Sequence, residues 1–220
     1  MKNKKLYSLI VAVAFLSLFV LWTIMLCFVD LKAIGPNGSK VGFSTLNNAI
    51  KGLIGVHLVL YVITDWLGLM PIAVAFGFGI VGLVQLVKRK SILKVDTDIL
   101  LLGAFYIVVF GTYILFEYLT INYRPILING YLEKSYPSST TILVTCVMPT
   151  AILQFRWRIK SNCLKRLLTI VTSLFIAFML IGRFISGVHW FSDIFGGLLY
   201  SIGIVSLYRF NCNVYGKRYN

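Results

Sequence analysis

Long uncharged apolar runs constrain this chain most, because each is too hydrophobic for the surface of a soluble protein. Residues 8–29 form the first run, which contains no charged residue and no small-residue cleavage site after it. A transmembrane helix needs about 20 predominantly apolar residues, so we expect an uncleaved first span. Similar runs predict further spans, which are residues 68–87, 99–119, 141–155, 167–181 and 194–208. With 59% hydrophobic residues, the chain is expected to form one all-α membrane domain over residues 1–220 with six transmembrane helices.

Residues 44–66 are ambiguous, because this segment is apolar but carries Lys51, His57 and Asp65. If it crosses the membrane, the basic cluster 88–94 lies opposite the amino-terminal lysines. If it does not, all basic clusters fall on one side, as the positive-inside rule requires. We therefore expect an outer interfacial helix at 44–66, both termini in the cytoplasm, and a multi-pass protein of the cell membrane. The basic clusters are Lys2, Lys4 and Lys5; Lys88, Arg89, Lys90 and Lys94; Arg156, Arg158, Lys160, Lys165 and Arg166; and Arg209, Lys217 and Arg218.

The net charge of +14 follows mostly from these orientation signals. It therefore does not indicate a nucleic-acid partner, and we expect none.

The run GRFISGVHWFSD contains the most reactive combination of side chains in the chain. Residues four apart share a helix face, so Asp193 is expected to accept a hydrogen bond from one imidazole nitrogen of His189. The other nitrogen then remains free as nucleophile or base. Arg183 offers a planar, permanently charged group for phosphoryl oxygens. The alternative is that His189 and Asp193 are structural, as a lone histidine beside an acid usually is.

Two more segments are predicted on the same outer face. The third span leads out to Arg124, and Pro137 with Ser138, Ser139 and Thr140 begins the fourth span. Free backbone N–H groups at such a helix start, together with the helix dipole, form a cradle for an anion. The alternative is that Ser138 merely caps the helix.

These residues in this order resemble the type 2 phosphatidic acid phosphatase superfamily, which comprises membrane lipid phosphatases and related vanadate haloperoxidases. The resemblance rests on Arg124-Pro125, then Pro137-Ser138, then Gly182-Arg183 with five residues to His189 and three to Asp193. It covers about residues 95–208.

The resemblance implies that His189 attacks phosphorus and forms a phosphohistidine, while Asp193 orients it. Arg124 and Arg183 would bind the phosphoryl oxygens, with Ser138 and the backbone at Ser139 and Thr140. Neither a metal nor another cofactor is implied. The expected function is hydrolysis of a lipid or isoprenoid phosphate or diphosphate at the outer leaflet.

Three residues depart from the family pattern. Glu117 stands where a lysine is expected, Ser139 replaces a glycine, and Thr140 replaces the histidine that protonates the leaving group. The other histidine, His57, lies far away in the sequence and is a weak substitute for that acid. Loss of a general acid costs about 10² to 10⁴ in rate. A lipid diphosphate, whose leaving group is a weak base, is therefore the expected substrate.

Two alternatives remain open. In the first, the chain is a catalytically impaired relative that binds anionic lipid headgroups. In the second, it is a small transporter. A transporter is disfavoured, because we find no internal repeat and the ionisable residues gather at span ends.

Overall fold

The computed structural model describes residues 2–216, and almost all of its regular structure is helical. The prediction of an all-α membrane bundle is confirmed. The α-helices are α1 (Lys2–Phe28), α2 (Ser44–Ile54), α3 (Leu58–Leu67), α4 (Leu69–Arg89), α5 (Thr97–Tyr118), α6 (Ser139–Arg158), α7 (Asn162–Ile185) and α8 (Phe191–Tyr215), with short 3-10 turns at Pro36–Gly38 and Ile92–Lys94.

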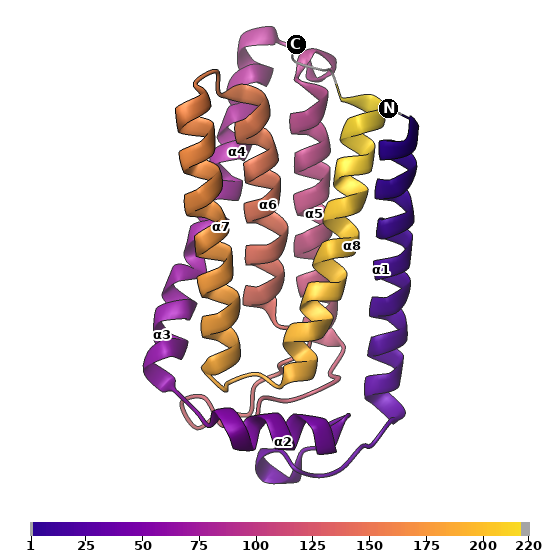
Figure 1. The fold of residues 1–220 in the computed structure, drawn as a ribbon, viewed down its shortest axis with the longest axis vertical. Helices are drawn as coiled ribbons and strands as arrows, with labels where there is room; N and C mark the ends of the chain where they lie inside the picture. The colour runs from indigo at the N-terminus through magenta and orange to yellow at the C-terminus, as the bar shows by residue number, and fades with distance from the viewer. Residues whose placement is uncertain (1, 217–220) are drawn as a thin grey trace.

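The long helices lie side by side and define two ends of the bundle (Figure 1). The start of α1, the end of α8 and the α4–α5 and α6–α7 connections lie at one end, which we call the basic end. The predicted basic clusters fall on these parts of the chain, whereas Lys217 and Arg218 lie outside the described residues. The opposite end carries α2, the long α5–α6 connection and the α7–α8 turn, and we call it the site end.

The prediction for residues 44–66 is wrong in its second half. Only α2 lies across the site end; α3 continues into α4 with a junction at Gly68, so that 58–89 is a single candidate span of 32 residues (Figure 1). Two polar residues of α3 instead contact α7 or lie beside it. Thr64 is completely buried, and Asp65 lies beside Arg183 of α7. The polarity of Thr64 and Asp65 therefore reflects their contacts with Arg183 of α7.

Helix α6 lies among the long helices, although it does not reach as far toward the site end as α7 and α8 (Figure 1), and it is too polar to count among the five described segments that are apolar enough to cross a membrane. The reason is its position, because α6 contacts α4, α5, α7 and α8. An inner helix touches protein on most sides and needs no apolar surface for lipid. Its buried hydroxyl and amide groups are satisfied within the bundle: Thr150 bonds to the α6 backbone and Gln154 donates to Tyr208 of α8.

An ion-pair network closes the basic end. Arg158, at the end of α6, donates to Asp98 at 2.5 Å and to Asp96 at 3.0 Å, both near the start of α5. The side chain of Asp98 is 2% exposed and that of Arg158 is 23% exposed. Removing one partner of a buried ion pair leaves an uncompensated charge. This pair therefore holds α5 against α6.

We expect Arg158→Met to lower the free energy of unfolding by on the order of 3 kcal/mol, and Asp98→Asn added to it to recover part of the loss. Detergent-solubilised variants can be melted with a thiol-reactive dye that reports exposure of the buried Cys146. The exposed Arg156 provides the control, since Arg156→Met should change little. A double variant less stable than Arg158→Met would contradict this account.

Candidate active site

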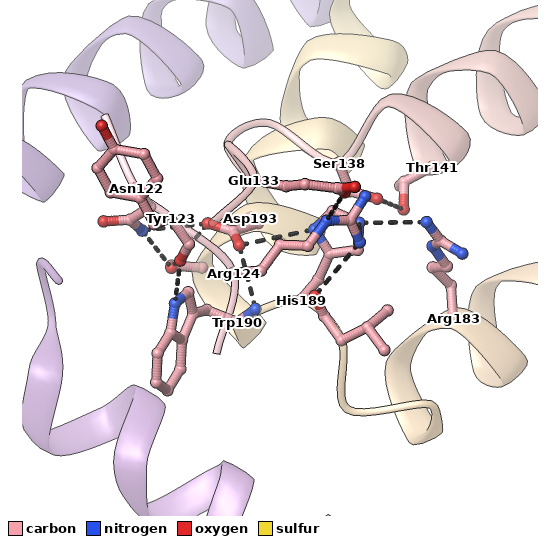
Figure 2. A network of polar contacts seen from close by, with 12 residues as sticks. Asn122, Tyr123, Arg124, Glu133, Ser138, Thr141, Arg183, His189, Trp190 and Asp193 are labelled. Carbon is pink, nitrogen blue, oxygen red and sulfur yellow. Dashed lines mark hydrogen bonds and ion pairs between the residues drawn. The ribbon is translucent and has the colours of Figure 1, made fainter. Parts of the chain in front are cut away.

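His189 lies in the turn between α7 and α8, at the site end, where three chain segments converge (Figure 2). The turn is shaped by Gly187, whose φ of +67° is rare for residues with a side chain. A Cβ at this position would also lie 2.0 Å from the backbone oxygen of Gly55, in the α2–α3 connection. The glycine thus lets the turn that carries His189 pass against the backbone before α3.

Two guanidinium groups meet at the Nε2 atom of His189. Nη1 of Arg124 lies 3.2 Å from this nitrogen and Nη2 of Arg183 lies 3.4 Å from it (Figure 2). Guanidinium groups only donate hydrogen bonds, so Nε2 accepts and the ring proton is on Nδ1. The structure therefore presents an unprotonated nitrogen between two cations.

The environment keeps this imidazole neutral. Burial, together with the positive charges of Arg124 and Arg183, holds the pKa of His189 well below its usual range. A histidine of ordinary pKa would be partly protonated as the pH falls toward 6.5. His189 instead keeps its lone pair at neutral and mildly acidic pH, as a nucleophile must.

Asp193 does not make the predicted hydrogen bond to His189. Its Oδ2 lies 3.7 Å from Nδ1 of the histidine, which has no hydrogen-bond partner. The prediction assumed that both residues lie on one helix, but α8 begins at Phe191, after His189. Asp193 instead caps α8 by accepting from the backbone N–H of Trp190 at 3.0 Å, and it accepts from Asn122 at 3.1 Å.

Helix α3 provides partners of Arg183 that the sequence did not reveal. Nη1 of Arg183 lies 3.5 Å from Oδ1 of Asp65 and 3.5 Å from Oγ1 of Thr64. The ring of Tyr61 lies beneath both arginines, with its centroid 5.0 Å from Cζ of Arg183 and 5.9 Å from Cζ of Arg124. These contacts partly compensate two like charges held close together. They were missed because α3 was assigned to an interfacial helix.

Arg124 belongs to a short antiparallel pairing inside the α5–α6 connection. Its backbone N–H donates to Glu133, and Nε of its side chain lies 2.9 Å from Oε2 of the same residue. Beyond it, Lys51 of α2 donates to the carbonyl oxygen of Pro125 at 2.7 Å, and Trp190 donates to that of Tyr123 at 2.7 Å. The connection is thus fixed between α2 and the start of α8.

The start of α6 lies against α8 at two glycines. A Cβ at Gly196 would lie 2.5 Å from the ring of Tyr136, and one at Gly197 would lie 3.4 Å from the backbone oxygen of Ser138. Ser138 occupies the N-cap position of α6, but its hydroxyl makes no cap hydrogen bond and accepts instead from Thr141 at 3.0 Å. The simple capping role considered for Ser138 is therefore not what its hydroxyl does.

Ser139 and Thr140 face different surroundings. Ser139 lines the cavity that contains His189. Thr140 lies at the α3–α4 junction, where its Cγ2 would be 3.4 Å from a Cβ built on Gly68. His57 is also turned away, since its ring is exposed and Nε2 lies 3.0 Å from the carbonyl oxygen of Ile54 in α2.

The cavity beside His189 has a volume of about 340 Å³ and two kinds of wall. Its polar lining is Glu117, Arg124, Lys134, Ser135, Ser139 and His189, and its apolar lining includes Ile72, Val109, Phe110, Phe116, Ile142 and Leu143. The apolar residues come from α4, α5 and α6. A ligand with a charged head and an apolar chain matches both walls. The described residues contain no group of three or more histidines, cysteines and carboxylates placed to hold a metal.

The comparisons with known proteins agree with this geometry. The model of the PAP2 superfamily matches residues 73–212, a range that contains Arg124, Arg183, His189 and Asp193. The fold is similar to the crystal structure of the first transmembrane PAP2 type phosphatidylglycerolphosphate phosphatase from Bacillus subtilis. The two chains are 20% identical, the TM-score is 0.56, and the match covers 96% of this chain and 99% of that one. A search of curated protein sequences found no match.

The structural likeness, at this identity, shows the shared fold of a multi-pass membrane protein, and the sequence model spans more than half of the residues. On that basis the chain belongs to the PAP2 superfamily.

Proposed function

We propose that this protein hydrolyses a lipid or isoprenoid phosphate or diphosphate at the outer leaflet through a phosphohistidine formed on His189. One observation carries the proposal: the unprotonated Nε2 of His189 lies between the guanidinium groups of Arg124 and Arg183, in a cavity with an apolar wall. The protein with the similar fold is a phosphatidylglycerolphosphate phosphatase, and phosphatidylglycerolphosphate is also a lipid phosphate.

The reaction has two steps. Nε2 of His189 attacks phosphorus, an N–P bond forms, and the bond from phosphorus to the leaving oxygen breaks. A water molecule then attacks the phosphohistidine, the N–P bond breaks, and inorganic phosphate leaves. Arg124 and Arg183 neutralise the negative charge on the phosphoryl oxygens in both transition states.

Asp193 acts through His189 in this scheme. Formation of the N–P bond makes the imidazole ring cationic, and its Nδ1–H faces the carboxylate of Asp193 at 3.7 Å. Asp193 is completely buried and is held by Asn122 and by the backbone of Trp190. A fixed negative charge at this position stabilises the cationic intermediate.

The position of Thr140 favours a diphosphate substrate. An alkoxide leaving group needs a proton from a general acid, whereas a leaving phosphate monoester is already a weak base. Thr140 cannot supply this proton near neutral pH, and the exposed ring of His57 contacts α2. A lipid diphosphate needs this proton least.

A second function uses the same site without turnover. The cations that bind a phosphoryl group would also hold an anionic lipid headgroup, and the lack of an acid at residue 140 is what favours this alternative. Phosphate release distinguishes the two functions.

His189→Ala should lower phosphate release from a prenyl diphosphate by at least about 10³-fold, because it removes the attacking nitrogen. The measurement is phosphate release by detergent-solubilised protein, with vanadate as a phosphate-like inhibitor of the wild type. His57→Ala is the matched control and should retain most activity. Unchanged activity in His189→Ala would rule out the phosphohistidine.

Substrate choice tests the leaving-group argument. We expect a higher kcat/KM for a prenyl diphosphate than for phosphatidic acid, by on the order of 10²-fold, because the missing acid contributes about that factor. Both substrates should be assayed in the same detergent micelles. A clear preference for phosphatidic acid would refute the argument and leave the role of His189 standing.

We also propose that the basic end is cytoplasmic, in keeping with the positive-inside rule. Cys163 is exposed at the basic end, and the exposed Lys40 lies before α2 at the site end. Two variants are compared, both with Cys27→Ser. The first also carries Lys40→Cys and Cys163→Ser, and an impermeant maleimide should label it in intact cells. The second keeps Cys163 and Lys40, and the maleimide should label it only after permeabilisation. The reverse pattern would contradict this orientation.

A further inference from the structure

The cavity beside His189 is lined by a second cation that the reaction above does not use. Lys134 lies in the α5–α6 connection, bridged to Tyr123, while its neighbours Glu133 and Ser135 are hydrogen-bonded through the backbone to Arg124 and Asn122. Side chains alternate along an extended strand. Glu133 accordingly reaches Arg124, whereas Lys134 reaches the end of α5.

The ammonium group of Lys134 is held but not neutralised. It donates to the backbone oxygen of Glu117, in the last turn of α5, where carbonyl groups have no acceptor role inside the helix. Among the described residues, no carboxylate forms an ion pair with Lys134. An ammonium group has three donors, so two remain for a ligand.

Lys134 lies beside the point on α5 where the lining of the cavity changes from polar to apolar, which is where the headgroup of a bound lipid would join its chain. From Glu117, one face of α5 runs through Tyr113 to Phe110 and Val109, and all four residues line the cavity. This face extends about 12 Å along the helix, at 1.5 Å per residue. Phe110 and Tyr113 are about half exposed, so the apolar wall is open to the side of the bundle.

His189 lines the same cavity as Lys134 and the apolar face of α5, so the leaving group is expected in this cavity. Arg124 and Arg183 contact Nε2 of His189 and therefore flank the phosphoryl group that is attacked. In phosphoryl transfer the leaving oxygen lies opposite the attacking atom. Arg183 does not line the cavity, so among the described residues Lys134 is the cation left for what lies beyond the attacked phosphorus.

We propose that Lys134 binds the second phosphoryl group of a lipid diphosphate and thereby determines the preference for diphosphates over monophosphates. This inference rests on the proposed function. His189 attacks the terminal phosphorus, the bond from that phosphorus to the bridging oxygen breaks, and the bridging oxygen keeps the electron pair. The leaving group is a lipid monophosphate whose added charge Lys134 offsets, so that no proton transfer is required.

The test compares a prenyl diphosphate with the prenyl monophosphate of the same chain. Lys134→Met should lower kcat/KM for the diphosphate by on the order of 10²-fold and leave that for the monophosphate nearly unchanged. Lys134→Arg should restore most of the diphosphate activity, because it keeps the charge while being unable to donate a proton. Lys40→Met, an exposed lysine at the same end, is the control. Equal losses on both substrates would overturn the proposal, as would failure of Lys134→Arg, which would point to an acid.

Binding gives a readout independent of turnover. The concentration of inorganic diphosphate that half-saturates a thermal shift should rise in Lys134→Met, while that of inorganic phosphate should not. If the half-saturating concentration of inorganic diphosphate is the same in Lys134→Met as in the wild type, the proposal is also overturned. Failure of the proposed function gives a different result. In that case the wild type releases no phosphate from any substrate, or His189→Ala stays active. Neither result depends on Lys134.

Discussion

The buried carboxylate of Asp193 is the constraint on which the site depends. A charge removed from water needs donors fixed around it, and here they come from distant segments: Asn122 of the α5–α6 connection and the backbone of Trp190. The backbone oxygen of Asp193 accepts from Ser138, which ties the start of α6 to the same residue. Asp193 thus binds the segment that carries Arg124, the start of α6 at Ser138, and the backbone next to His189.

The two arginines concentrate positive charge at one histidine nitrogen. Like charges that share one histidine nitrogen repel each other, and Asp65 and Glu133 offset them only from their outer sides. Both carboxylates are partly exposed, at 54% and 42%, so water weakens their compensation. Between the arginines the positive potential remains, beside a cavity that Arg124 and His189 line and that has apolar walls. A phosphoryl dianion is the group that such a pocket stabilises best.

The sequence predicted the membrane bundle and the convergence of Arg124, Arg183, His189 and Asp193, because apolar runs fix the order in which helices cross. It failed where tertiary contacts decide. Thr64 and Asp65 looked interfacial because nothing local shows that α7 supplies Arg183 as their partner. The expected hydrogen bond from His189 to Asp193 required both residues to lie on one helix, but α8 begins two residues after His189. Asn122 carries no local signal, since its place beside Asp193 comes from tertiary structure within an irregular connection.

The missing acid at residue 140 is a property of the bundle as much as of one side chain. Thr140 lies against the α3–α4 junction at Gly68, and one turn earlier in α3 Thr64 packs against Gly182, next to Arg183. The continuous α3–α4 segment therefore occupies the side of α6 from which an acid at residue 140 would act. Its α3 part also supplies Asp65 and Tyr61 to Arg183. Under the proposed function, α3 supports an arginine that binds the phosphoryl group, and protonation of the leaving group is left to the substrate's own chemistry. The proposed reaction therefore requires a weakly basic leaving group, and our proposal places that group beside Lys134, which lines the same cavity as His189.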